Sequence, residues 1–171
     1  MQYHDLVSSR YSVRAYDTRP VETALIRRIL EDARLAPSAV NKQPWKILAV
    51  RGQEAMGRLA KCTKYTFGAP AAMIVGYDAD KAWIRSYDNM NSGIIDASII
   101  STYIMLSIHD LGLGSCWVGH FDPAALSAHM AVKFTPVAIF PFGYPALDAK
   151  PSTNHTKRLP LDETVQYDGD F

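Results

Sequence analysis

The sequence predicts one α+β domain, in which helices and strands are mixed without regular βαβ alternation. Residues 92–111 form an apolar segment of helical length, whereas residues 71–77 and 136–142 are apolar runs of strand length. The 171 residues suit a single domain, residues 1–171, because no repeat, low-complexity tract or long linker divides them.

The first half of the chain predicts three helices and two strands. A short helix covers Tyr3–Ser9, and a second helix opens at Pro20 and Glu22 and ends before Pro37. Its apolar side chains recur at helical spacing, at Leu25, Ile26, Ile29, Leu30 and Ala33. The remaining predicted elements are a polar loop over 36–45, a strand over 46–50, a helix over 54–61 and a buried strand over 71–77.

The segment 92–111 carries apolar side chains on nearly every helical face, so we expect a buried helix. Asp96 lies near its start, where the helix dipole favours a carboxylate. Gly112 and Gly114 end the helix. The elements predicted after it are a strand over 115–119, a helix over 123–131, a strand over 136–142 and a turn at 143–145.

The tail from Asp148 onward is polar, contains proline and has few residues that could form a core. Such a segment is either frayed or laid across another surface, for example that of a partner subunit.

Composition excludes several classes of protein. Hydrophobic residues make up 48% and charged residues 20%, which is typical of a soluble globular chain rather than a disordered one. The net charge of +1 gives no electrostatic argument for binding nucleic acid or an anionic membrane. No apolar run reaches the roughly 18 residues of a membrane span. The N-terminus does not resemble a signal peptide.

The cysteines and histidines predict neither a metal site nor a disulfide framework. Cys62 and Cys116 are isolated, and the five histidines are scattered without ligand spacing or a catalytic triad pattern. We therefore expect a cytoplasmic protein without a metal.

The first candidate site is Arg10-Tyr11-Ser12-Val13-Arg14. In an extended segment, alternate residues face the same side, so two guanidiniums and a hydroxyl would form an anion clamp. Alternatively, the segment is a solvated basic turn. Lys157-Arg158 in the tail either lies on the surface or completes the phosphate site that Arg10 begins.

Two further motifs could contact a flat ligand. The loop Ala36–Trp45 presents Ser38, Asn41 and Gln43 between two prolines, and these groups can read the edge of a heteroaromatic ring. An ordinary helix-to-strand connector would look similar.

The segment Gly112–Gly119 contains closely spaced glycines, but it follows a helix and opens a strand, which is the reverse of a dinucleotide fingerprint. Its glycines either let backbone approach a ligand near Gly119 or only cap the helix beside a core Trp117.

Together these motifs resemble the nitroreductase family of FMN-dependent oxidoreductases, over nearly the whole chain and in its compact branch. The resemblance rests on the following segments: Arg10–Arg14, Ala36–Ser38, Asn41, Gln43–Trp45, Asp96-Ala97, Gly112–Gly119 and Gly143–Pro145. The family often has Ser or Thr at the two positions after the loop serine, where this chain has Ala39 and Val40 and so lacks two hydroxyls.

The resemblance implies a mixed central β-sheet flanked by helices, and an intertwined homodimer with FMN at the interface. The tail, about residues 148–171, would embrace the partner. The cofactor-binding residues from one subunit would be Arg10, Tyr11, Ser12, Arg14, Trp117, Val118, Gly119, Lys157 and Arg158. Those from the other would be Pro37, Ser38, Ala39, Asn41 and Gln43. We also expect Lys64 or Tyr65 to contact the flavin or the nicotinamide.

The implied activity is ping-pong transfer of hydride from NADH or NADPH through flavin N5 to nitroaromatics, quinones or similar acceptors. No side chain would act as nucleophile. Arg14 would stabilise negative charge on the reduced ring, while Arg10, Ser12 and Arg158 would bind the phosphate. A backbone N–H of Val118 or Gly119 would contact N5 or the C4 carbonyl.

Two alternatives remain open. One is a flavin-binding or flavin-handling protein of the same superfamily with different or no nitroreductase activity. The other is a dimeric interaction domain that is not an enzyme. The sequence leaves the physiological acceptor and the preferred nicotinamide undetermined.

Overall fold

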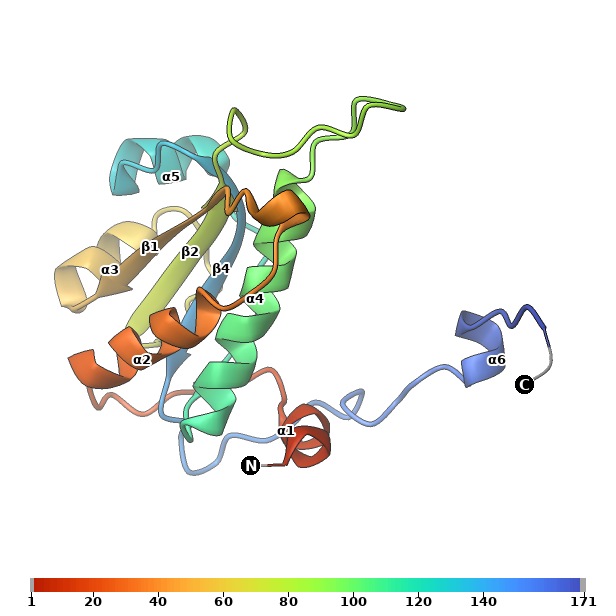
Figure 1. The fold of residues 1–171 in the computed structure, drawn as a ribbon. Coiled ribbons are helices and arrows are strands. Elements are labelled where there is room, and N and C mark those ends of the chain that lie inside the picture. The colour runs from red at the N-terminus through yellow and green to blue at the C-terminus, as the bar shows by residue number, and fades with distance from the viewer. Residues whose placement is uncertain (1, 170–171) are drawn as a thin grey trace.

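The computed structural model describes residues 2–169 as a four-stranded sheet covered by helices on both faces (Figure 1). The elements are α1 (Tyr3–Ser9), α2 (Thr23–Ala33), the 3-10 turn η1 (Ala39–Asn41), β1 (Trp45–Arg51), α3 (Gln53–Leu59), β2 (Ala71–Tyr77), α4 (Gly93–Asp110), β3 (Gly114–Ser115), α5 (Pro123–Met130), β4 (Thr135–Gly143) and α6 (Leu161–Thr164).

The strand order is β1-β2-β4-β3, and every ladder is antiparallel. The predicted α+β class is confirmed, but the expectation of a mixed sheet is not met by the described strands of this chain. The parallel pairing among residues 2–169 is the isolated bridge between Ser12 and Ser115 at the β3 edge.

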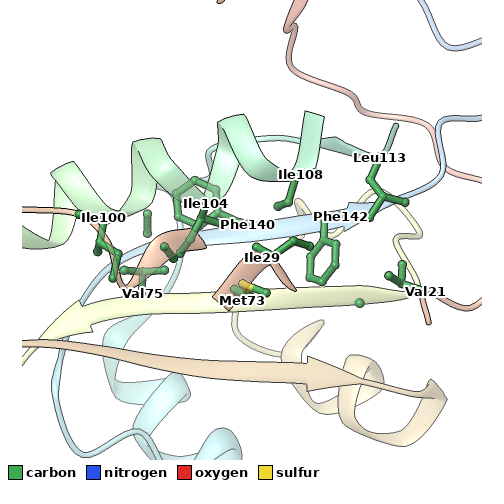
Figure 2. Packing of buried hydrophobic residues seen from close by; sticks show 14 of the residues in the cluster. Val21, Ile29, Met73, Val75, Ile100, Ile104, Ile108, Leu113, Phe140 and Phe142 are labelled. Atoms are coloured by element: carbon green, nitrogen blue, oxygen red, sulfur yellow. The ribbon is translucent and has the colours of Figure 1, made fainter. Parts of the chain in front are cut away.

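The central strand β2 is buried on both faces, which explains its uninterrupted apolar sequence. Its alternate residues serve two cores. Met73 and Val75 pack with α2 and α4, whereas Ala72 and Ile74 pack with α3 and α5. Figure 2 shows the first core, which includes Ile29, Ile100, Ile104, Ile108, Phe140 and Phe142.

Helix α4 is not buried on every face, contrary to the expectation from its composition. Ile94 is 55% exposed and Ile95 is 47% exposed, and Tyr103 extends the same apolar surface. Ile94, Ile95, Ser98, Ile99 and Thr102 line a shallow hollow of about 340 Å³ there. No described element of the same chain covers this side, so a largely apolar helix leaves part of its apolar surface in solvent.

Two other predictions need correction. The strand expected over 115–119 is only the two-residue β3, because the ladder with β4 breaks after Ser115 and resumes as a single bridge between Val118 and Ile139. The tail also contains the short helix α6, which sequence periodicity did not predict. Figure 1 shows this part of the tail lying apart from the sheet and its helices.

Within residues 2–169, no helix combines the length and the apolar character needed to cross a membrane.

The glycines after α4 have different roles. Gly112 has φ +75°, and its N–H donates to His109 while that of Leu113 donates to Ile108, which is the Schellman arrangement that ends a helix. Gly114 lies against the segment Arg10–Arg14, and a Cβ there would come within 2.4 Å of Val13 Cγ2. Gly114 therefore lets this segment approach the sheet edge.

Replacing Gly114 with alanine should lower the free energy of unfolding by about 1–3 kcal/mol, because Val13 must move away from the sheet. Gly57→Ala is the matched control: Gly57 lies in α3 with nothing within 4 Å of an added Cβ, so alanine should be neutral or stabilise by up to about 1 kcal/mol. Urea unfolding of both variants measures the difference, and equal effects would contradict this account of Gly114.

Candidate functional site

The segment after α1 is held in extended form against the edge of the sheet. Val13 N–H donates to the Ser115 carbonyl at 3.0 Å, and the Val13 side chain is only 2% exposed. The Tyr16 hydroxyl lies 2.8 Å from the Val13 carbonyl oxygen and 2.9 Å from that of Pro141. Because Val13 points into the core, Ser12 and Arg14 face the opposite side, as predicted from alternation.

Arg10, Ser12 and Arg14 line one cavity of about 290 Å³, which we call the clamp cavity. Its other lining residues are Tyr11, Ser152, Asn154, His155 and Arg158. Three guanidiniums thus converge on a small polar space, which suits a phosphate group. Lys157 is exposed and does not line this cavity.

The tail reaches the clamp cavity because its first part folds back along the N-terminal segment. The rings of Tyr11 and His155 pack edge to face with centroids 6.2 Å apart. Arg158 Nη1 donates to the carbonyls of His155 at 2.6 Å and Lys157 at 2.7 Å, which fixes the guanidinium beside the cavity.

Ser152, Asn154 and His155 were not predicted as site residues. The sequence feature that could have indicated them is the polar run directly before Lys157-Arg158.

A second cavity of about 330 Å³, the aromatic cavity, adjoins the first at Arg14, which lines both. Its other lining residues are Tyr65, Phe67, Cys116, Trp117, Val118, Gly119 and His120. Trp117 packs edge to face on Phe140, with ring centroids 5.1 Å apart. A cationic space and an aromatic space that share one arginine can accommodate a flat ring that carries a phosphate.

The backbone at the aromatic cavity corrects one expectation. Val118 N–H donates to the Ile139 carbonyl at 2.9 Å, so it is not available to a ligand. Gly119 N–H has no hydrogen-bond acceptor within residues 2–169, which leaves it as the available donor. Tyr65 lines this cavity, whereas Lys64 lines a neighbouring hollow that shares His120 with it.

Two titratable groups beside the arginines are held neutral. Burial raises the pKa of the Cys116 thiol, although Arg14 partly offsets this effect. Burial and the positive charge of Arg10 lower the pKa of His109, whose Nε2 lies 2.9 Å from Ser9 Oγ. Neither group adds charge beside the arginines near neutral pH.

The loop that contains Ser38 is anchored by a buried carboxylate. Asp96 is 1% exposed, and its Oδ1 accepts from Ala39 N–H at 2.9 Å while its Oδ2 accepts from the Ser92 hydroxyl at 2.8 Å. The sequence indicated only a favourable position for Asp96 in the helix dipole. The signal for this further role was a carboxylate in the first turn of a largely apolar helix, whose other acidic residue, Asp110, is its last.

The loop is held in an unusual backbone conformation. Val40, Asn41 and Gln43 have φ of 43°, 56° and 49°. Gln43 N–H donates to Ser38 Oγ at 2.9 Å, and Gln43 Nε2 donates to Asn41 Oδ1 at 3.1 Å. These bonds hold the left-handed residues in place and fix the amides on the loop surface.

The structure does not bring this loop and the clamp cavity together within one chain. The loop is tied to Asp96 near the start of α4. The segment Arg10–Arg14, which we call the clamp segment, follows Ser9, and the contact between Ser9 and His109 holds it near the other end of the helix (Figure 1). His109 follows Asp96 by thirteen positions in the helix, which is about 20 Å along the axis. None of the cavities described above is lined by Pro37, Ser38, Ala39, Asn41 or Gln43.

Comparison with known proteins identifies the family to which this chain belongs. The profile of the Nitroreductase family matches residues 7–67 and 59–144. A solved structure of a nitroreductase family protein from Clostridium difficile 630 is 33% identical, covers 99% of both chains and superposes with a TM-score of 0.91. The chain therefore belongs to the nitroreductase family and is an oxidoreductase, as predicted.

Further relatives agree with this assignment. A protein from Methanothermobacter thermautotrophicus, provisionally named NADH dehydrogenase/NAD(P)H nitroreductase, is 32% identical over 155 residues, or 85% of this chain and 78% of its own length. A structure from Exiguobacterium sibiricum in complex with FMN is 22% identical, covers 98% of both chains and has a TM-score of 0.85. The structural similarity to the Exiguobacterium sibiricum protein supports the assignment of the fold.

Replacing Asp96 with alanine should lower the free energy of unfolding by about 2 kcal/mol, because Ala39 N–H and the Ser92 hydroxyl lose a charged acceptor. Glu54→Ala is the control, since that carboxylate is 92% exposed and its ion pair with Arg58 contributes less than about 1 kcal/mol. Hydrogen exchange at Ala39 should rise in the Asp96 variant only. Unchanged exchange there would contradict the anchoring role.

Proposed function

We propose that this protein is an FMN-dependent oxidoreductase that uses NADH or NADPH to reduce nitroaromatics, quinones or similar small acceptors in the cytoplasm. The observation that carries the proposal is the junction of the clamp and aromatic cavities at Arg14. A phosphate in one cavity and a flat ring in the other match the two ends of FMN.

The residues present fit this cofactor. Arg10, Ser12 and Arg158 would hold the phosphate, since two guanidiniums and a hydroxyl supply several donors in a small space. Trp117 and Tyr65 offer apolar surface to the ring. Lys157 lies outside the clamp cavity, so its contribution would be long-range charge.

When bound, FMN supplies the redox chemistry by accepting a hydride from the nicotinamide and passing electrons to the acceptor. The protein's part is binding, orientation and charge. The Arg14 guanidinium would stabilise negative charge that develops on the ring, and the Gly119 N–H would donate a hydrogen bond to the ring edge. Neither role requires a side-chain nucleophile.

The homodimer is the second part of this proposal. The exposed apolar face of α4 is typical of an interaction surface. Two copies of this face can pack against each other around a two-fold axis. Figure 1 shows α6 lying apart from the sheet and its helices. Leu159 and Leu161 are exposed there, so this part of the tail can contact a partner.

An antiparallel pairing of the two α4 helices would also complete the site. The loop with Ser38 lies at the start of α4 and the clamp cavity lies near its end. Antiparallel helices bring the start of one beside the end of the other, so each clamp cavity would receive the partner's loop, including Pro37, Ser38, Ala39, Asn41 and Gln43.

The basic test is spectroscopic. Purified protein should bind FMN, lose flavin absorbance on addition of NADH or NADPH, and regain it with a nitroaromatic or a quinone. Protein that binds FMN but is not reduced would instead indicate the flavin-handling alternative, and failure to bind FMN would refute the proposal.

The two arginines of the clamp segment should differ in their effects. Arg10→Ala should raise the Kd for FMN about tenfold or more through loss of a charged hydrogen bond, with a weaker salt dependence than the wild type. Arg14→Ala should lower the reduction potential of the bound flavin. Arg34→Ala, which removes an exposed arginine paired with Glu31, should change neither. An unchanged potential in Arg14→Ala would contradict its role.

A further inference from the structure

The hollow that Lys64 lines adjoins the aromatic cavity, and we call it the basic hollow. It has a volume of about 390 Å³, and its walls are residues 60–64, which follow α3, and residues 120–122, which precede α5. His120 lines both the basic hollow and the aromatic cavity. The aromatic cavity therefore adjoins the clamp cavity at Arg14 and the basic hollow at His120.

Hydrogen bonds join the two walls of the basic hollow. The Thr63 hydroxyl donates to the His120 carbonyl at 2.7 Å, and Asp122 N–H donates to the Cys62 carbonyl at 2.9 Å. Tyr65 N–H donates to Thr63 Oγ1 at 3.2 Å, and the rings of Tyr65 and His120 pack edge to face with centroids 5.4 Å apart. These contacts fix the edge that the basic hollow shares with the aromatic cavity.

Two lysines give the basic hollow a positive charge. Lys61 and Lys64 are exposed, and neither forms an ion pair with a carboxylate of residues 2–169. Lys64 Nζ lies 5.3 Å from the centroid of the Tyr65 ring, which lines the aromatic cavity.

The hollow also contains a carboxylate, that of Asp122. Its Oδ1 accepts from Ala124 N–H at 2.8 Å and Ala125 N–H at 3.2 Å at the start of α5, so the helix partly compensates its charge. The remaining charge of the basic hollow favours an anion.

The proposed reductant carries an anion at a suitable place. In NADH and NADPH, one ribose separates the nicotinamide from the pyrophosphate. Hydride transfer requires the nicotinamide to lie against the flavin ring, and therefore at the aromatic cavity. The phosphate of FMN would occupy the clamp cavity, so the pyrophosphate of the reductant needs a different cationic space next to the aromatic cavity. The basic hollow meets this requirement.

We propose that Lys61 and Lys64 bind the pyrophosphate of NADH or NADPH in the basic hollow while the nicotinamide occupies the aromatic cavity. This inference rests on the proposed function, because it assigns a subsite for the reductant in that same site. Lysine ammonium groups act on phosphate as point charges. Since the pyrophosphate is common to both dinucleotides, the two lysines would strengthen the binding of NADH and NADPH equally.

Protection from acetylation tests the placement in the full-length, FMN-loaded protein. The probe is 1,4,5,6-tetrahydro-NADH, which has the phosphates of NADH but does not donate a hydride. Its binding should slow the acetylation of Lys61 and Lys64, measured by mass spectrometry. Lys46, which is exposed in β1 and lines none of the cavities described above, should react at an unchanged rate. Equal protection of all three lysines, or of none, would overturn the placement.

Stopped-flow reduction of the bound flavin tests the role. Lys61→Gln with Lys64→Gln should raise the Kd for NADH and for NADPH about tenfold and weaken its dependence on salt, because two charges are lost. The Kd for 1-benzyl-1,4-dihydronicotinamide, which has no phosphate, should change less than about twofold. Replacing both lysines with arginine should keep tight binding of the dinucleotides, and Lys46→Gln is the control for loss of a surface charge.

Three results would overturn the inference. An equal rise in Kd for the phosphate-free reductant would place the lysines against the nicotinamide or the flavin. A rise for NADPH alone would place its 2′-phosphate, and not the pyrophosphate, in the basic hollow. Unchanged Kd values for both dinucleotides would leave the lysines without a role in binding them. Failure of the wild type to bind FMN, or to be reduced by any of the three reductants, would instead refute the proposed function.

Discussion

Helix α4 sets the distance between the two parts of the candidate site. Its buried face, which includes Ile100, Ile104 and Ile108, packs on the sheet and fixes its direction. Asp96 anchors the loop with Ser38 near one end, and His109 contacts Ser9, directly before the clamp segment, at the other. The helix does not shorten or bend to bring these parts together. This spacing, together with the exposed face from Ile94 to Tyr103, is the reason for proposing that two chains share each site.

The positive charge of the candidate site is concentrated at the clamp cavity. The chain carries a net charge of only +1, yet three arginines converge on one cavity. Burial lowers the pKa of His109 and raises that of Cys116, and both shifts favour the neutral forms of these groups beside the arginines. Arg14 lines both cavities, so in the proposed FMN complex it would lie between the phosphate and the ring.

Local patterns in the sequence predicted much of this architecture. Strand β2 was predicted over its observed residues, because burial on both faces leaves a continuous apolar run. Alternation predicted that Arg10, Ser12 and Arg14 share one side, and all three line the clamp cavity, as does Tyr11. The shared cavity of Arg10 and Arg158 was predicted from family resemblance, because nothing local connects these residues.

Other features depend on contacts between distant residues. The bond from Ala39 to Asp96 spans 57 positions, and Ser152, Asn154 and His155 reach the clamp cavity only because the tail folds back. An apolar side chain such as Ile95 looks the same in the sequence whether it faces a core or a partner. The prediction that α4 is buried on every face was therefore wrong, whereas the predicted length of the helix was nearly right.

FMN stoichiometry in mixed dimers tests most directly whether each site is shared. One chain would carry Arg10→Ala with Arg14→Ala, and the other Asn41→Asp with Gln43→Glu, which places negative charge on the loop. If each site combines one chain's clamp segment with the other's loop, the mixed dimer regains one intact site and binds about one FMN, although neither parent dimer binds it well. If both parts act within one chain, every site in the mixed dimer stays defective. Binding no better than that of the parents would contradict the shared site.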